Sequence, residues 1–171
     1  LIIFVDIDRQ LAQPEYNATE GTWHTIWKTQ YMRNTDSRFL IQTHNPQSTI
    51  FRSLGEPDRF YRTELQLRKA LFYPPYSYFV RCFYGHFNKD VAKKQAENAY
   101  TQINSTLTKD KKCIIIDSPY EMHPNYYRKK YWYGILFRLQ PKTWYEDTQW
   151  ISKFFGPGWR IDPNPISILS P

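Results

Sequence analysis

Residues 64–79, ELQLRKALFYPPYSYF, join a helical pattern to an aromatic run that is typical of a strand. Upstream, apolar residues recur at helical spacing from Pro57 to Leu71. Pro74 and Pro75 then end the helix, because proline has no N–H to donate and disfavours the α conformation of the residue before it. The two prolines therefore predict a boundary between two folding units.

The region before this joint has the pattern of strand, helix, strand. Residues 1–7 form a continuous apolar run, which is typical of a buried parallel strand. Residues 22–30 carry apolar side chains at helical spacing, and residues 39–43 form a second strand candidate. This order predicts the end of an α/β sheet. Because the chain starts at Leu1 inside a strand, we expect it to be a segment of a longer protein.

Asp6 and Asp8 lie at the end of the first predicted strand. In open α/β sheets the carboxyl ends of the strands face the ligand crevice, so these two carboxylates are candidate site residues. The start of an ordinary solvated loop explains them equally well.

Beyond the joint, helical and strand patterns alternate regularly. Strands are predicted at residues 76–84, 112–117, 129–139 and 158–162. Asn88 is the predicted cap of one intervening helix, and Thr143 with Glu146 forms the capping-box pattern at the start of the other. The order βαββαβ predicts an α+β ferredoxin-like sandwich with an antiparallel sheet. That arrangement leaves one face of the sheet without helices and available for binding.

The strand at residues 129–139 and the turn before it combine cations with aromatic rings. Strand alternation places Tyr131 and Tyr133 in the core, and Lys130, Trp132 and Arg138 on the opposite, exposed face. Cations beside rings suit phosphate contact and base stacking. The predicted contact residues are Arg128, Lys129, Lys130, Trp132 and Arg138. A solvated strand edge is the alternative.

Composition favours a polyanionic partner. The 171 residues carry a formal net charge of +7, the isoelectric point is about 9.3, and aromatic residues make up 18% of the chain. Nucleic acid is the leading partner, although aromatic residues also serve ordinary core packing. The two cysteines exclude a four-cysteine zinc site and favour a reducing, cytoplasmic setting. The opening apolar run is too short to cross a membrane, so no membrane partner is expected.

Catalytic and metal-binding motifs are missing from the sequence. The six glycines form neither G-x-x-x-x-G-K-[ST] nor G-x-G-x-x-G, so no phosphate-binding loop is encoded. The four histidines are scattered without metal-ligand spacing. We therefore assign no catalytic residue, no metal and no cofactor to this segment.

Several motifs, in order along the chain, resemble the PriA family of replication-restart DNA helicases (primosomal protein N-prime). The first run comprises Asp6, Asp8, Leu11, Pro14-Glu15-Tyr16, Ala18, Glu20 and Thr22. The later matches are Ile41-Gln-Thr-His-Asn-Pro46, Glu64-x-x-x-Arg68 with Tyr73-Pro-Pro-Tyr76, Asp117-Ser-Pro-Tyr120, the strand from Lys129, and Trp159-Arg-Ile-Asp-Pro-Asn-Pro-Ile-Ser167. The resemblance covers essentially the whole chain, and the Tyr-Pro-Pro-Tyr joint is its strongest part.

The chain departs from this family after the first run. The family carries Q-x-x-G-R-x-G-R there, with arginines that reach the phosphates of the nucleotide. Either Lys28 or Gln30 can be aligned with the motif's glutamine, and in neither alignment does an arginine occupy an arginine position of the motif. Arg33 lies one residue away from such a position. Loss of such an arginine costs about 10³ to 10⁵ in the rate of phosphoryl transfer. Whether the protein is an enzyme is therefore left open.

The resemblance implies three regions. Residues 1–56 are the end of a RecA-like second helicase lobe, residues 57–75 a connecting helix and joint, and residues 76–171 a C-terminal domain. Asp6, Asp8, Glu20, Gln30 and Arg33 are remnants of helicase motifs. ATP with magnesium, and zinc, are expected only if upstream helicase regions exist.

The resemblance also implies the function and the partners. We expect binding of single-stranded or forked DNA at stalled forks, docking of the acidic tail of single-stranded DNA-binding protein, and contact with other primosome proteins in a bacterial cytoplasm. Two alternatives are kept. One is an inactive helicase paralogue that acts as a scaffold, and the other is an RNA-binding ferredoxin-like module, although the RNP1 pattern of such modules is missing.

Overall fold

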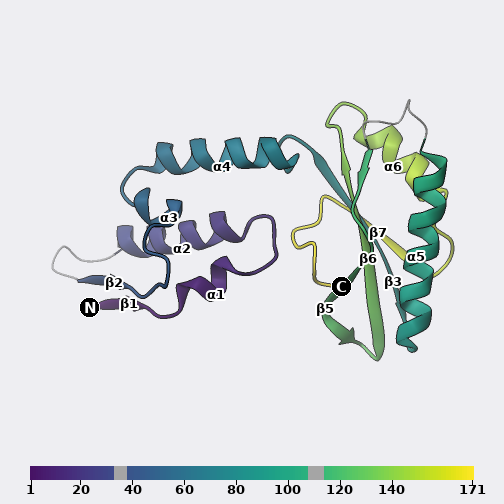
Figure 1. Ribbon diagram of the computed structural model, residues 1–171, viewed down its shortest axis with the longest axis horizontal. Coiled ribbons are helices and arrows are strands. Elements are labelled where there is room, and N and C mark those ends of the chain that lie inside the picture. Colours follow the sequence, from purple (N-terminus) through teal and green to yellow (C-terminus); the bar gives the residue numbers. More distant parts are fainter. Residues whose placement is uncertain (33–37, 108–113) are drawn as a thin grey trace. The chain divides into compact units, whose positions relative to one another are not determined.

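The structure is a computed structural model that describes residues 1–32, 38–107 and 114–171. The chain forms two compact units, Leu1–Leu67 and Arg68–Pro171 (Figure 1). Within the described residues, no helix is long and apolar enough to cross a membrane.

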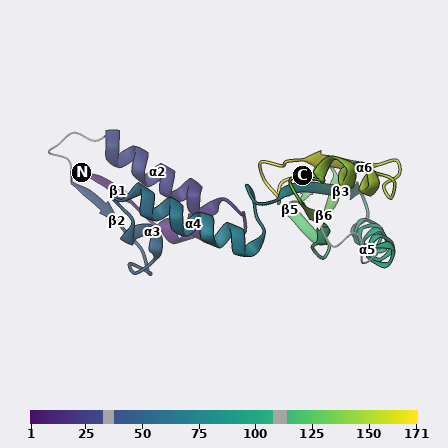
Figure 2. The same ribbon diagram turned by 90° about the horizontal axis from the view of Figure 1, so that it is seen from above.

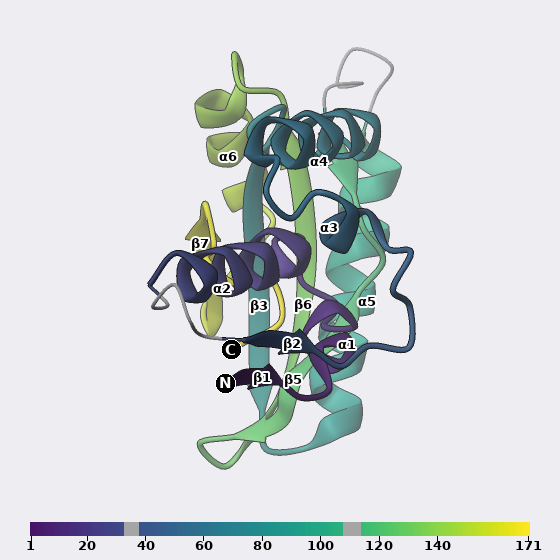
Figure 3. The ribbon, with the colours of Figure 1, turned by 90° about the vertical axis from the view of Figure 1, so that its left-hand side faces the viewer.

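The first unit combines helices with a pair of short strands. Its elements are β1 (Ile2–Phe4), α1 (Ile7–Leu11), α2 (Ala18–Met32), β2 (Phe39–Ile41), α3 (Thr49–Arg52) and α4 (Pro57–Leu71), the last of which continues into the second unit. The helices α2 and α4 lie side by side (Figure 2), and β1 pairs with β2 in parallel (Figure 3). The core consists of Ile7, Trp23, Ile26, Ile50 and Phe60.

The first strand is shorter and more exposed than the sequence predicts. Ile3 is 52% exposed and Val5 is 69% exposed, so the prediction of a buried strand over residues 1–7 is wrong within this chain. Phe4 packs on the core of the first unit, whereas the next residue on either side faces solvent. Alternation puts neighbouring side chains on opposite faces, and the core covers one of them.

The second unit is built on an antiparallel sheet. Its elements are β3 (Tyr78–His86), α5 (Lys89–Thr106), β4 (Ile114–Ile116), β5 (Tyr120–Tyr127), β6 (Lys130–Leu139), α6 (Trp144–Ser152) and β7 (Trp159–Pro163). The strand order is β4-β6-β3-β7, and β5 also pairs with β6. Every pairing is antiparallel. The fold is therefore mixed α/β with an antiparallel sheet, as expected.

Both helices of the second unit pack on the same face of the sheet. Their contact residues are Ala99 and Ile103 of α5 and Ile151 of α6, against Val80, Cys82, Ile135 and Phe137 of the sheet. The predicted cap of α5 is confirmed, because the Asn88 side chain accepts hydrogen bonds from the N–H groups of Asp90 and Val91. The predicted capping box of α6 is not formed, since the Thr143 hydroxyl donates to the Asp147 carboxylate at 2.7 Å instead.

The opposite face of the sheet is covered in part by the chain's own C-terminal residues. The N–H of Asn164 donates to Phe79 O at 2.7 Å, and the Tyr120 hydroxyl donates to Ile168 O. Arg81 donates to Ser170 O, and its guanidinium is ion-paired with Asp162 at 2.7 Å. This face is therefore less open than the sequence predicts.

The diproline joint is held to the second unit. The helix α4 ends at Leu71, Phe72 has a left-handed backbone (φ 54°), and Pro74 and Pro75 follow. Arg138 of β6 donates to Leu71 O at 2.9 Å, and the Ser77 hydroxyl donates to Phe72 O at 2.8 Å. These contacts fix the chain at the residues where the sequence predicts a boundary.

Candidate nucleic-acid interface

The positive charge of the protein lies in its second unit. Sixteen of the 23 Lys and Arg residues and eight of the 16 Asp and Glu residues fall within Arg68–Pro171, which gives this unit a net charge of +8 and the first unit −1. Such a charge attracts polyanions over a range of about 8 Å at physiological salt. A nucleic-acid site is therefore expected in the second unit.

Three consecutive cations lie where β5 turns into β6. Tyr127 pairs with Lys130 across a two-residue turn made of Arg128 and Lys129. All three cations are exposed, and none makes an ion pair within the part of the chain that the structure describes. Arg128 lies 5.1 Å from the centre of the Tyr127 ring, and Tyr126 is also exposed. Arg128, Lys129 and Lys130 are called the hairpin cations below.

The turn itself has an unusual backbone. Arg128 and Lys129 have φ values of 51° and 61°, which lie in the left-handed region. Two-residue hairpin turns of this kind prefer Asn-Gly, because side chains with bulky Cβ substituents are strained there. Strain of this type costs roughly 1 to 3 kcal/mol per residue and is concentrated at functional sites. Two long cations in place of Asn-Gly are therefore a reason to assign a function to this turn.

Trp132 is buried, so the prediction that it is exposed on the binding face is wrong. Its side chain is 3% exposed and packs with Phe83 and Met122. Its indole N–H donates to Tyr127 O at 2.9 Å. A Cβ on Gly85 would lie 2.6 Å from the ring, so the ring fits only against a glycine. Trp132 thus braces the base of the hairpin and has no free face for a nucleobase.

Arg160 of β7 is a candidate residue that the sequence did not reveal. It is exposed, and its guanidinium lies 5.0 Å from the centre of the Trp132 ring, with Lys130 6.0 Å from the same centre. Neither cation is ion-paired among the described residues. The register of the sheet would have revealed this residue. It pairs Arg160 with Phe83, on the face of the sheet that also holds Trp132.

Arg138, the remaining predicted contact residue of the second unit, is engaged within the fold. Its guanidinium is ion-paired with Asp117, donates to Leu71 O, and lies 5.7 Å from the centre of the Tyr73 ring. The side chain is largely buried. These contacts hold the diproline joint to the sheet. Contact between Arg138 and nucleic acid stays a prediction.

The predicted helicase-motif residues lie in the first unit. Asp8 joins the ends of the parallel strands, since its carboxylate accepts hydrogen bonds from the Thr43 hydroxyl and the His44 N–H, both at 2.7 Å. These hydrogen bonds lower the pKa of Asp8, and the bond from the His44 N–H has the largest effect. Asp6 has a left-handed backbone before α1 and makes no side-chain cap. Glu20 and Gln30 lie on α2, whereas Arg33 lies outside the described residues.

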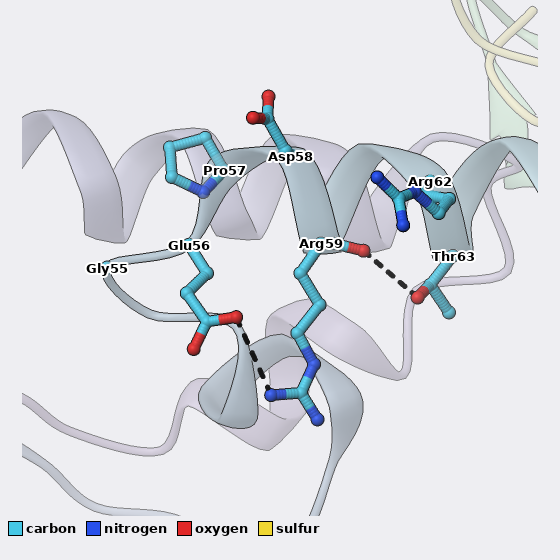
Figure 4. A pocket seen from close by; sticks show the side chains of 7 residues that line it. All are labelled: Gly55, Glu56, Pro57, Asp58, Arg59, Arg62 and Thr63. Carbon is cyan, nitrogen blue, oxygen red and sulfur yellow. Dashed lines mark hydrogen bonds and ion pairs between the residues drawn. The ribbon is translucent and has the colours of Figure 1, made fainter.

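A surface pocket of about 630 Å³ lies at the start of α4 (Figure 4). Its charged side chains are Glu56, Asp58, Arg59 and Arg62, and Arg59 is 3.7 Å from the Glu56 carboxylate. The charges balance, so the pocket has no preference for an anion. No group of three metal-ligating side chains occurs among residues 1–32, 38–107 and 114–171.

Comparison with known proteins finds a similarity to a replication restart protein. No protein-family model matches the chain. The replication restart protein PriA of Thermotoga maritima is 33% identical over 111 residues, which cover 63% of this chain and 14% of that protein. The chain contains a PriA-related segment. The aligned part is a small fraction of the relative's length, so the relative's activity does not transfer by similarity alone.

Proposed function

We propose that this chain is a portion of a PriA-like replication-restart protein and that its second unit binds single-stranded or forked DNA. The similarity to PriA supports the first part of the proposal. The observation that carries the second part is the run of three exposed cations at a strained turn, which make no ion pair among the described residues. Lys130 of this run and Arg160 lie by the same Trp132 ring, in a unit with a net charge of +8. Within a primosome, this unit would hold DNA at a stalled fork.

The hairpin cations and Arg160 contact the phosphates in this proposal. Each phosphate contact releases counterions, so affinity falls with salt by about 0.7 log unit per log unit of salt for single strands. Tyr126 and Tyr127 supply exposed rings beside the cations. Trp132 acts indirectly, since it holds Arg160 and the hairpin in place.

The proposed domain organisation follows the resemblance. Residues 1–56 are the end of a second helicase lobe, 57–75 the connection, and 76–171 a ferredoxin-like C-terminal domain. The strand order, with two helices on one face, supports a split βαβ architecture for the second unit. ATP hydrolysis is not part of the proposed role of this segment.

A second ligand for the same cations is the acidic tail of single-stranded DNA-binding protein. Unpaired exposed cations bind carboxylates as well as phosphates, and Arg does so with two parallel hydrogen bonds. The tail and the DNA would then compete for Arg128 and Arg160. Competition between the two ligands is the expected result of titrating one into the complex with the other.

The test is a binding titration with labelled single-stranded and forked DNA. Lys130→Ala with Arg160→Ala should weaken binding to both DNAs, whereas Lys142→Ala with Lys153→Ala removes the same charge from exposed positions around α6 and serves as the matched control. RNA of the same sequence tests the alternative of an RNA-binding module. If both double variants lost the same DNA affinity, the loss would be explained by net charge alone, and the assigned site would be wrong.

A further inference from the structure

Four aromatic rings form a continuous stack in the first unit. Phe60 of α4 stacks on Trp23 of α2, with ring centres 4.5 Å apart and planes inclined by 6°. Trp23 stacks on Trp27 at 5.9 Å and 14°, and Trp27 stacks on Tyr31 at 5.6 Å and 14°. The three rings on α2 are spaced four residues apart and so share one face of the helix. The four rings are called the aromatic column below.

The aromatic column runs from the core to the surface. Trp23 is 1% exposed, Trp27 39% and Tyr31 79%. The inner half is core packing, since Trp23 and Phe60 belong to the buried cluster of this unit. Trp27 and Tyr31 do not belong to that cluster. The column ends in a ring that is stacked on one side and open to solvent over most of its surface.

One cation lies near the open end on the same helix. Between Trp23 and Met32 the sequence holds one formal charge, Lys28, and no carboxylate. Lys28 is exposed and precedes Tyr31 by three residues, so the two lie on neighbouring positions of the helix surface. A flat ring beside a cation is the arrangement that accepts a base together with its phosphate.

We propose that the open end of the aromatic column binds an unpaired base of a single-stranded nucleic acid, with Lys28 at the phosphate. Stacking on Tyr31 continues the column by one ring. The site lies in the first unit. The proposal for this site is therefore independent of the proposal for the hairpin cations.

The test compares an oligothymidylate of about 12 nucleotides, within the range of single-strand site sizes, with an abasic oligonucleotide of the same length. In a chain that also carries Lys130→Ala and Arg160→Ala, Tyr31→Ala and Tyr31→Leu should weaken binding of the oligothymidylate by at least about fivefold, because both remove the stacking ring. Tyr31→Phe keeps a ring and should bind as the parent does. None of the three should alter binding of the abasic oligonucleotide. Tyr145→Ala on α6, another exposed ring, is the matched control.

The salt dependence separates this site from the hairpin. Loss of Tyr31 should leave the slope of affinity against salt unchanged, because no phosphate contact is lost. Unchanged affinity of Tyr31→Ala for the oligothymidylate, or an equal loss for the abasic strand, would overturn the proposal. A dimer in sedimentation that Tyr31→Ala dissociates would also overturn it, since a second copy of the chain would then cover the column.

Discussion

The guanidinium of Arg160 lies 5.0 Å from the centre of the Trp132 ring. The ring is buried, while the guanidinium is at the surface. The position of an exposed cation therefore depends on a buried side chain two strands away. Substitution of the two residues should consequently have different effects on stability and on binding.

Trp132→Ala should destabilise the second unit. A buried tryptophan replaced by alanine leaves a cavity, and the expected loss in free energy of unfolding is about 3 to 5 kcal/mol. Gly85→Ala should also destabilise, because its Cβ would lie 2.6 Å from the ring. Urea denaturation followed by tryptophan fluorescence measures both. Arg160→Ala should leave the unfolding midpoint unchanged and reduce DNA affinity. A lower midpoint with unchanged DNA affinity would show that Arg160 is not part of the DNA site.

Arg138→Ala should lower the stability of the second unit by about 1 to 3 kcal/mol. The substitution breaks the ion pair with Asp117 and the hydrogen bond to Leu71 O. Asp117→Asn removes the ion pair and keeps the contact with Leu71, so a smaller loss is expected. If Arg138→Ala leaves unfolding unaffected and weakens DNA binding instead, then Arg138 contacts the DNA directly.

The link between Asp8 and the loop after β2 should depend on pH. The His44 N–H, followed by the Thr43 hydroxyl, holds the pKa of Asp8 below its ordinary value of 3.8. A lowered pKa in the folded state stabilises above the unfolded pKa, and this stabilisation is lost as the pH falls through the folded value. Exchange of the His44 amide hydrogen should therefore accelerate, relative to its intrinsic rate, below about pH 3.8.

Asp8→Ala is the control for this pH dependence, because it removes both acceptor oxygens. It should remove the protection of the His44 amide at neutral pH and make it insensitive to pH in the acid range. An amide that exchanges alike in both proteins at every pH would show that Asp8 does not hold the loop.

The parts of the fold that depend on local pattern could be predicted from the sequence. Asn88 caps α5 as expected, and the alternation along β6 places Tyr133 and Ile135 on the helix-covered face. The strand β5 was missed, because Pro124 interrupts its pattern. A register shift between Glu121 and Tyr126 accommodates the interruption.

The parts that depend on distant contacts could not be predicted. Alternation gives the face on which Trp132 lies, but its burial follows from Gly85 and from the side chains of Phe83 and Met122 that surround it. The same holds for Arg160, whose place beside Trp132 is set by pairing between strands far apart in sequence. Neither relationship has a signal within a short window of sequence.

The hairpin turn offers the most direct test of the proposed DNA site. Arg128→Asn with Lys129→Gly replaces two strained cations by the residues that such turns prefer. The proposal predicts a variant that is more stable by at least about 2 kcal/mol, because strain of roughly 1 to 3 kcal/mol is relieved at each of the two residues. It also predicts weaker binding of single-stranded DNA, with the slope of log affinity against log salt reduced by about 1.4, or 0.7 for each lost phosphate contact. A variant that gains stability while its affinity and salt slope stay unchanged would contradict the assignment of this hairpin to DNA binding.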